Sequence, residues 1–440
     1  MSLLSVAPGA EISEAERSVI ENRPPNCAVQ FRERVAKSPD REAFRYPDAS
    51  ENWQSLSWRE AGEVVDRLAA GLLALGVQPR QRVAIASGTR YEWILADLAI
   101  MCAGAATTTV YPTTIEEDVA YILSDSESRV VFAEDDEQVG KLRTVRDQIP
   151  TVTKVVVLDN MAPADDGDGW IITLAQLEEM GAEHLAANPS AVDDVVASIE
   201  PTDLATLIYT SGTTGRPKGV RLRHSSWTYE GVAVQAQGIL SEDDLQFLWL
   251  PMAHSFGKVL LSTQLAIGFP TAIDGRVDKI VENLGIVKPT FMGAAPRIFE
   301  KAHGRIVTMQ AAEGGVKEKL FLKAFEVGKK KDALERAGKP VPFLLNVQHG
   351  LFDALVFKKV RERFGGRVRF FISGAAALNK DIAEWFNAAG IQILEGYGLT
   401  ESSAGSFVNL PDSNKFGTVG RVFPGSLVKL GQDDEVLIKG

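Results

Sequence analysis

The chain has 440 residues, 47 of them basic and 58 acidic, and a formal net charge of -11 at pH 7. Its 45% hydrophobic and 24% charged content excludes wholesale disorder and is typical of a globular protein with a large core. The acidic balance argues against nucleic acid as a partner, because proteins that bind it usually carry net positive charge. The cysteines, Cys27 and Cys102, have the spacing of neither a disulfide framework nor a metal site.

The first 18 residues lack the basic region followed by an apolar core that marks a signal peptide. The most apolar stretch, residues 93–106, is interrupted by Asp97 and is too short to span a bilayer. We therefore expect a cytoplasmic protein.

Helical and strand patterns alternate from about residue 57 onward. Ser57 and Glu60 have the spacing of a capping box, apolar residues then recur at helical spacing, and Gly76 stands where a helix stop is expected. The elements that follow are strands at 83–86, 129–133 and 154–158 and a helix at 91–103. Strands alternating with helices predict a mostly parallel sheet that is covered on both faces.

A second αβ pattern runs from about residue 205 past residue 400. Within it, residues 316–364 predict two amphipathic helices joined at 338–340. The basic run at 329–331 is expected to form a solvated helix face, and peripheral contact with an anionic membrane is the alternative. Residues 417–440 predict short antiparallel strands or part of a small barrel.

A loop rich in glycine and hydroxyl residues follows the predicted strand at 205–209. Its members are Thr210, Ser211, Gly212, Thr213, Thr214, Gly215, Lys218 and Gly219. Glycines let backbone N–H groups approach an anion, while hydroxyls and a lysine add donors and charge, so the loop indicates a polyphosphate site. It lacks the Gly-Lys-Ser/Thr ending of a P-loop, and no Rossmann glycine fingerprint opens a helix, which disfavours P-loop NTPases and dinucleotide dehydrogenases.

This loop closely resembles the signature of the adenylate-forming superfamily, which includes acyl-CoA synthetases, firefly luciferase and peptide-synthetase adenylation domains. Further segments resemble family motifs in the expected order: 250–254, 295–301, 373–378, 395–401, and 417–421 with 423–425. The segment at 295–301 is most similar to long-chain fatty acyl-CoA synthetases, and the resemblance covers essentially the whole chain. It implies two doubly wound αβ subdomains, at about 20–200 and 201–400, and a small β-rich subdomain beginning at about 405–440.

The resemblance also implies a reaction. A fatty acid carboxylate attacks ATP to give acyl-AMP and pyrophosphate, and the thiol of coenzyme A then displaces AMP. The first step needs charge stabilisation and in-line positioning more than a protein nucleophile, and the chain shows no Ser–His–Asp pattern.

Individual roles follow from the same resemblance. The loop residues Thr210, Ser211, Gly212, Thr213, Thr214, Gly215 and Lys218 would wrap the phosphates; Gly374, Ala375 and Ala376 would face the adenine edge; and Glu395, Gly396, Tyr397 and Gly398 would carry the stacking ring. Thr400 would donate to the α-phosphate, and Glu401 would hold Mg²⁺ with help from Thr213. His254 would polarise or gate the carboxylate site. Lys258 stands where some long-chain relatives carry a tryptophan gate, so that gate is not expected.

Several points stay open here. Phe247, Trp249 and Phe291 could line an acyl tunnel or belong to the core. Residues 402–440 match neither the ribose-binding nor the lysine-bearing motif of relatives, so we interpret the chain as a large N-terminal portion that binds substrates but turns over poorly. The alternatives are an acyl-AMP ligase, a medium-chain or aryl-CoA ligase, and a non-catalytic nucleotide-binding scaffold; a homodimer is also left open.

Overall fold

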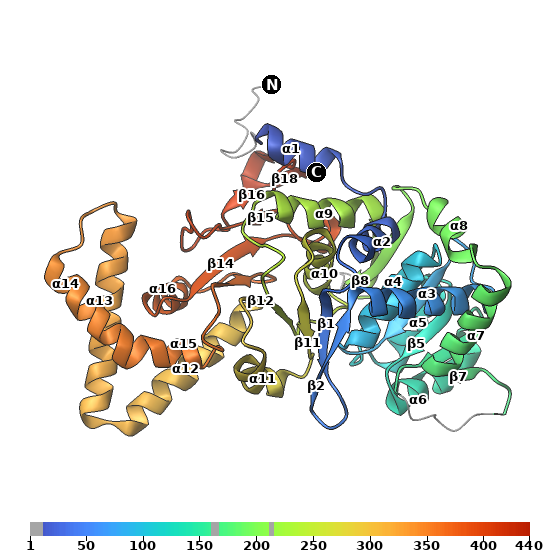
Figure 1. Ribbon diagram of the computed structural model, residues 1–440, viewed down its shortest axis with the longest axis horizontal. Helices are drawn as coiled ribbons and strands as arrows, with labels where there is room; N and C mark the ends of the chain where they lie inside the picture. The colour runs from blue at the N-terminus through green and yellow to red at the C-terminus, as the bar shows by residue number, and fades with distance from the viewer. Residues whose placement is uncertain (1–11, 160–166, 211–214) are drawn as a thin grey trace.

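The computed structural model describes residues 12–159, 167–210 and 215–440, which fold around two large β-sheets (Figure 1). The strand order of the first sheet is β7-β6-β5-β3-β4-β8-β9, and every pair is parallel except β8 with β9. Its strands are β3 (Arg82–Ala86), β4 (Ala106–Val110), β5 (Ser128–Ala133), β6 (Lys154–Val157), β7 (Ile171–Thr173), β8 (Leu204–Thr210) and β9 (Lys218–Arg223). β3, β4, β5 and β6 are buried almost throughout, as expected for parallel strands covered on both faces.

The second sheet has the order β16-β15-β14-β13-β12-β10-β11-β1-β2, parallel in its centre and antiparallel at both edges. Its strands are β1 (Glu42–Pro47), β2 (Trp53–Ser57), β10 (Gln246–Leu248), β11 (Thr271–Ile273), β12 (Phe291–Ala294), β13 (Phe370–Ser373), β14 (Gln392–Tyr397), β15 (Phe407–Val408) and β16 (Arg421–Val422). A separate hairpin, β17 (Leu427–Leu430) with β18 (Val436–Lys439), supplies the antiparallel strands predicted near the end of the chain.

This architecture confirms the predicted mixed αβ fold class with mostly parallel sheets. The sheets nevertheless exchange strands across the division expected near residue 201. β8 and β9 complete the first sheet, whereas β1 and β2, from the start of the chain, form an edge of the second. Which sheet a strand joins depends on distant partners, such as Phe44 in β1 beside Thr271 in β11, and hydrophobic periodicity carries no information about them.

Six helices accompany the first sheet in the described part of the chain: α3 (Trp58–Ala74), α4 (Tyr91–Cys102), α5 (Glu116–Asp125), α6 (Asp136–Thr144), α7 (Leu174–Ala187) and α8 (Ala191–Ala197). The predicted capping box begins α3: the Ser57 hydroxyl accepts the Glu60 N–H at 3.2 Å, and the Glu60 carboxylate accepts the Ser57 N–H at 2.8 Å. Gly76, at φ +83°, follows the end of this helix as predicted.

The helices near the second sheet form two groups. α1 (Glu14–Glu21), α2 (Cys27–Lys37), α9 (His224–Ala236), α10 (Ser255–Ile267), α11 (Ile280–Val287) and α16 (Lys380–Ala388) lie around the sheet; α12 (Pro296–Glu313), α13 (Gly315–Arg336), α14 (Phe343–Phe352), the π-helical turn η3 (Asp353–Phe357) and α15 (Lys358–Glu362) form an arm that projects at the left of Figure 1. The arm contains the two helices predicted for residues 316–364. No helix in the described segments is both long and apolar enough to span a bilayer.

A buried ion pair connects the two halves of the molecule. Asp97 on α4 is fully buried and pairs with Lys258 on α10, whose side chain is 3% exposed. The Thr107 hydroxyl on β4 donates to the other Asp97 oxygen at 2.7 Å. The ammonium also lies 5.8 Å from the Trp93 ring centre and 6.0 Å from that of Trp227. Lys258 is therefore part of the core between the sheets.

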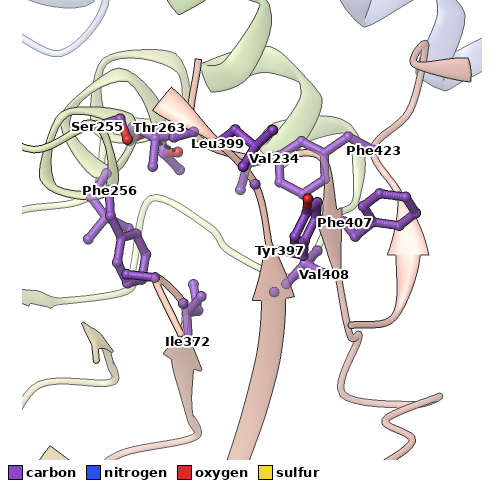
Figure 2. Close-up of a pocket in the computed structure, with 18 of the residues that line it drawn as sticks. Val234, Ser255, Phe256, Thr263, Ile372, Tyr397, Leu399, Phe407, Val408 and Phe423 are labelled. Carbon is purple, nitrogen blue, oxygen red and sulfur yellow. Dashed lines mark hydrogen bonds between the residues drawn. The ribbon is translucent and has the colours of Figure 1, made fainter. Parts of the chain in front are cut away.

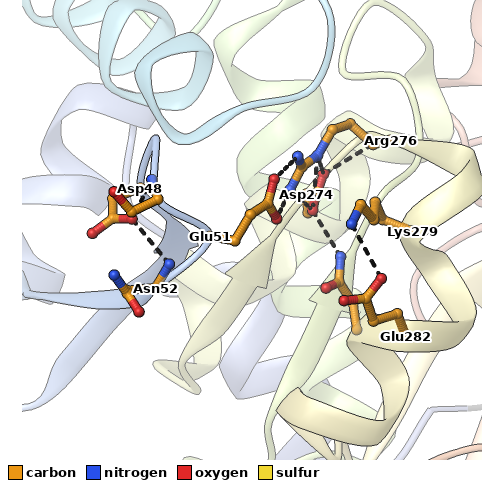
Figure 3. A network of polar contacts seen from close by, with 9 residues as sticks. Asp48, Glu51, Asn52, Asp274, Arg276, Lys279 and Glu282 are labelled. Atoms are coloured by element: carbon orange, nitrogen blue, oxygen red, sulfur yellow. Dashed lines mark hydrogen bonds and ion pairs between the residues drawn. The ribbon is translucent and has the colours of Figure 1, made fainter.

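A second polar network anchors the outer edge of the second sheet (Figure 3). Arg276 donates four hydrogen bonds to the Asp274 carboxylate at the end of β11, one of them from its backbone N–H, and two to Glu51 in the turn between β1 and β2. Asn283 on α11 donates to the same Asp274 carboxylate at 2.7 Å. Burial alone would raise the pKa of Asp274, but the hydrogen bonds from Arg276 and Asn283 outweigh it and lower that pKa. One guanidinium thus fixes the β1–β2 turn to the neighbouring strand.

Candidate functional site

A cavity of about 370 Å³ lies between helices α9 and α10 and the carboxyl ends of β13 and β14 (Figure 2). Its apolar wall includes Val234, Leu240, Val259, Leu260, Ile372, Phe407, Val408 and Phe423. Its polar wall includes Thr210, His254, Ser255, Ser373, Gly374, Tyr397, Thr400 and Glu401. Ligand sites in open αβ sheets occur at the carboxyl ends of strands, so this position is the expected one.

A second cavity, of about 480 Å³, adjoins the first on the side of the seven-stranded sheet. Thr210, His254 and Thr400 line both cavities and therefore stand at their junction. The remaining walls come from the end of β4 and the segment after it, from α5, and from β8 and the loop after it: Thr109, Tyr111, Thr113, Thr114, Ile115, Asp118, Ile122, Ile208, Tyr209 and Pro217. The three residues at the junction come from three separate predicted motifs.

The predicted phosphate loop connects β8 to β9. Thr210 ends β8 and Lys218 begins β9, while Gly215 has φ +105°, a conformation that favours glycine. Four predicted phosphate ligands, Ser211, Gly212, Thr213 and Thr214, lie outside the described residues. The Lys218 side chain is exposed.

His254 is held in one tautomer, and its burial favours the neutral ring. It caps the N-terminus of α10, where its Nδ1 accepts the Phe256 N–H at 3.1 Å. Burial lowers the pKa of His254, so the ring is neutral at pH 7. A neutral imidazole that accepts at Nδ1 carries its proton at Nε2. His254 can therefore donate one hydrogen bond where the two cavities meet.

The segment 396–401 brings the predicted adenine and metal residues together. A Cβ on Gly398 would lie 1.3 Å from the Ala404 carbonyl oxygen, so only glycine allows this loop closure. Tyr397 is 38% exposed, and its ring meets Phe407 at 5.9 Å and an angle of 64°. The Thr400 hydroxyl lies 3.4 Å from that of Ser255, and the Glu401 carboxyl is exposed at the cavity wall.

The loop after Glu401 has a strained backbone and is bound by Glu230, a residue that sequence reasoning missed. Ser403 and Ala404 have φ +65° and +91°, values that are uncommon for residues other than glycine. Beneath them, the Gly405 N–H donates to Glu230 Oε2 on α9 at 3.2 Å. Burial raises the pKa of Glu230 well above its ordinary value, and its Oε1 has no hydrogen-bond partner in the described part of the structure. A lone glutamate in a helix pattern gave no signal of this role.

The other predicted site residues divide into those that line the cavity and those that support it. Gly374 and Ala375 line it, whereas Ala376 does not. Glu395 also lies outside both linings, and its carboxylate accepts the Leu378 N–H at 2.9 Å, which ties the 374–378 segment to β14. Glu395 therefore acts by positioning the segment. The aromatic residues considered for an acyl tunnel, Phe247, Trp249 and Phe291, are buried in the core and do not line the cavity.

The described residues contain no cluster of three or more side chains of the types that ligate metals. A single exposed carboxylate, Glu401, stands at the cavity wall. One carboxylate with waters and substrate phosphates is the donor set that Mg²⁺ commonly uses in nucleotide sites. The site thus fits Mg²⁺ that arrives with a nucleotide better than a metal held by the protein alone.

Comparison with known proteins shows that the chain matches a known family. The family described as AMP-binding enzyme matches residues 31–439. The long-chain-fatty-acid–CoA ligase FadD15 of Mycobacterium bovis is 34% identical over 395 residues, which cover 88% of this chain and 63% of that protein. The chain therefore spans less than two-thirds of that relative's length.

Two solved structures share the fold. The anthranilate CoA ligase AuaEII in complex with anthranoyl-AMP has a TM-score of 0.69 and 18% identity, over 96% of this chain and 70% of that one. The inhibitor-bound N-terminal domain of FACL13 from Mycobacterium tuberculosis has a TM-score of 0.67 and 21% identity, over 94% and 86% of the two chains. Sequence identities this low support a shared fold and nothing more specific. With its family matched over almost its whole length, the chain belongs to the AMP-binding enzymes.

Proposed function

We propose that this chain forms the ATP- and acid-binding part of an AMP-forming ligase that activates long-chain fatty acids for transfer to coenzyme A. The observation that carries the proposal is the junction of the two cavities at Thr210, His254 and Thr400. One cavity has a mainly apolar wall suited to an acyl chain and also carries Gly374, Ala375 and Tyr397, the residues proposed for adenine, and the other adjoins the loop proposed to bind phosphates. The carboxylate of the acid and the α-phosphate of ATP would meet at the junction.

The residues at the junction supply positioning and charge stabilisation, which is what adenylation requires. The Nε2–H of His254 would donate to the acid carboxylate and turn one oxygen toward phosphorus. The Thr400 hydroxyl would donate to the α-phosphate, where negative charge accumulates. Lys218 would offset the charge of the leaving pyrophosphate. Tyr397 would stack on adenine, with Gly374 and Ala375 at the base edge.

Mg²⁺ would be held by Glu401, with Thr213 as a second proposed ligand, and would neutralise phosphate charge when bound. Glu395 supports the adenine side indirectly, through the hydrogen bond to the Leu378 N–H. Coenzyme A is proposed as the acceptor because the FadD15 relative is named as a CoA ligase. That name is also the support for a long acyl chain over the aryl and medium-chain alternatives.

Thermal-shift titration with non-hydrolysable acyl-adenylate analogues tests the proposal, since it measures binding and does not depend on turnover. A ligand that binds only the folded state stabilises it by about 2.7 kcal/mol at 100 times its dissociation constant. We expect stabilisation by every adenylate and the largest shift with a long saturated chain. An optimum at a short or aryl acid would reject the long-chain assignment. Stabilisation by ATP and AMP but by no acyl-adenylate would favour the nucleotide-binding scaffold.

A further inference from the structure

Helix α14 in the projecting arm exposes a continuous apolar surface. Its ten residues contain no Lys, Arg, Asp or Glu. The exposed fractions on this surface, which we name the α14 face, are 83% for Phe343, 67% for Leu344, 52% for Val347, 59% for Leu351 and 45% for Leu355. Single exposed apolar side chains are ordinary, but a contiguous row of this kind usually marks an interaction site.

The spacing of these residues places them along one side of a helix. Leu344, Val347, Leu351 and Leu355 follow one another at three or four positions, the interval at which helical side chains are neighbours. α14, η3 and α15 run without interruption from residue 343 to residue 362. The opposite side is already packed: Phe357 is fully buried and meets the Phe325 ring of α13 at 5.2 Å. The α14 face is therefore the side left without a partner.

Basic residues surround this apolar row. Lys339 precedes α14, and Lys358 and Lys359 begin α15, shortly after Leu355; all three are exposed. Residues 315–367 contain 13 basic residues (Lys317, Lys319, Lys323, Lys329, Lys330, Lys331, Arg336, Lys339, Lys358, Lys359, Arg361, Arg363 and Arg367) and six acidic ones (Glu318, Glu326, Asp332, Glu335, Asp353 and Glu362). This segment, which includes α13, α14 and α15 of the arm, is thus net basic in a chain whose total charge is -11.

We propose that the α14 face is a membrane-docking surface that lies in the headgroup region of a bilayer containing anionic phospholipid. An uncharged apolar row that ends in lysines is the pattern of helices that rest in a membrane interface. Phe343 and Leu344 would enter the acyl boundary, while Lys339, Lys358 and Lys359 would bind lipid phosphates. The helix lies on the membrane without crossing it. This inference stands independently of the proposed enzymatic function.

Charge favours a lipid surface over a second copy of the chain. Two α14 faces packed on each other would crowd the basic arms, which would repel, whereas an anionic bilayer complements them. The α14 face combines apolar side chains with cations, which match the acyl chains and the phosphate groups of a lipid surface. Self-association through this face remains a distinct outcome that the experiment can identify.

Vesicle flotation of the 440-residue chain tests the proposal. We expect binding to vesicles of equimolar phosphatidylcholine and phosphatidylglycerol, and much weaker binding to phosphatidylcholine alone. The double variant Leu344→Ser/Val347→Ser should weaken partitioning at least about ten-fold, because two partly inserted apolar side chains are lost. Lys358→Gln and Lys359→Gln should each weaken it about five-fold, and high salt should remove that difference. The matched control Val281→Ser/Ile286→Ser, which changes two exposed residues on α11, should bind as the original chain does.

A fluorescence measurement locates the contact. Both native cysteines are buried, so Val347→Cys offers a single accessible thiol for a polarity-sensitive dye. Its emission should shift to the blue when anionic vesicles are added, and that of the Val281→Cys control should not. Equal binding by the Leu344→Ser/Val347→Ser variant, or a failure to bind either vesicle, would overturn the proposal. So would a dimer that this variant dissociates, which would assign the face to a second copy.

Discussion

Removing one partner of the Asp97–Lys258 pair should be among the most destabilising single changes in this protein. Asp97→Asn leaves the Lys258 ammonium buried without its counter-charge, and Lys258→Met leaves Asp97 with only the Thr107 hydroxyl. An unpaired buried charge costs about 3–5 kcal/mol of unfolding free energy. The nearby rings of Trp93 and Trp227 recover little of this, since a cation–π contact is worth about 0.5–2 kcal/mol.

The double variant Asp97→Asn/Lys258→Met distinguishes the contribution of the ion pair from that of side-chain packing. It removes both charges and leaves side chains of similar size, so it should be more stable than either single variant. The two changes should couple by at least about 2 kcal/mol in a double-mutant cycle. Urea unfolding followed by tryptophan fluorescence measures the cycle, with circular dichroism as a second probe to establish that the transition is two-state.

A matched surface pair provides the control. Lys323 and Glu326 form a 2.8 Å ion pair with side chains 56% and 66% exposed, and Lys323→Met should cost less than about 1 kcal/mol. If Asp97→Asn and Lys258→Met were each as mild as Lys323→Met, the pair would not be desolvated and the reasoning would be wrong. Strictly additive single effects would refute the coupling in the same way.

Three further predictions concern the site, and the first has a control variant in helix α12. Gly398→Ala must move the Ala404 carbonyl from 1.3 Å to at least 3.0 Å from the new Cβ, so affinity for an acyl-adenylate analogue should fall at least about ten-fold in calorimetric titration. Gly304→Ala, where a Cβ meets nothing within 4 Å in helix α12, should instead raise stability by about 0.5–1 kcal/mol. Glu230→Gln should flatten the fall in melting temperature that accompanies a rise in pH above about 5, because the raised pKa of Glu230 makes the unfolded chain ionise first and costs stability as pH rises toward the folded-state pKa. His254→Ala should weaken analogue binding about five- to ten-fold through one lost hydrogen bond, with no pH dependence from this group above neutrality, since its pKa is lowered.

Each of these has an outcome that contradicts it. Unchanged affinity in Gly398→Ala would mean that the loop relaxes without disturbing the site, and a loss of stability in Gly304→Ala would show that this helix surface is not open. Parallel melting curves for Glu230→Gln and the original chain would show that Glu230 does not titrate differently on unfolding. If the His254→Ala variant bound the analogue as tightly as the original chain does, His254 would have no role in binding.

Local signals in the sequence predicted several elements, among them the helices α3 and α4 and the strands β3, β5, β6 and β8, whereas the site residues were inferred from the family resemblance. The capping box at Ser57 and the strand before the phosphate loop both depend on residues close in the chain. Short-range rules of this kind suffice for elements of regular period. The parallel strands followed from such rules. The meeting of Thr210, His254 and Thr400 at one junction was not predicted and is seen only in the structure.

What the sequence could not reveal depends on distant partners. The role of Lys258 depends on its ion pair with Asp97, 161 positions away. The role of Glu230 depends on its hydrogen bond with Gly405, 175 positions away. Glu395 was expected at the nucleotide because it opens a motif, yet its carboxylate accepts a hydrogen bond from the Leu378 N–H. Burial and pairing determine such roles, and neither can be derived from composition or spacing.

The position of β1 has a consequence for folding during synthesis. Phe44 pairs with Thr271, so the ribosome must add more than two hundred residues before the inner neighbour of β1 exists. At about 5–20 residues per second, that interval lasts roughly 10–50 seconds. Until then β1 and β2 can form only a lone hairpin with an unpaired inner edge, which is marginally stable by itself. We therefore expect this hairpin to be the part of the nascent chain that most needs a chaperone.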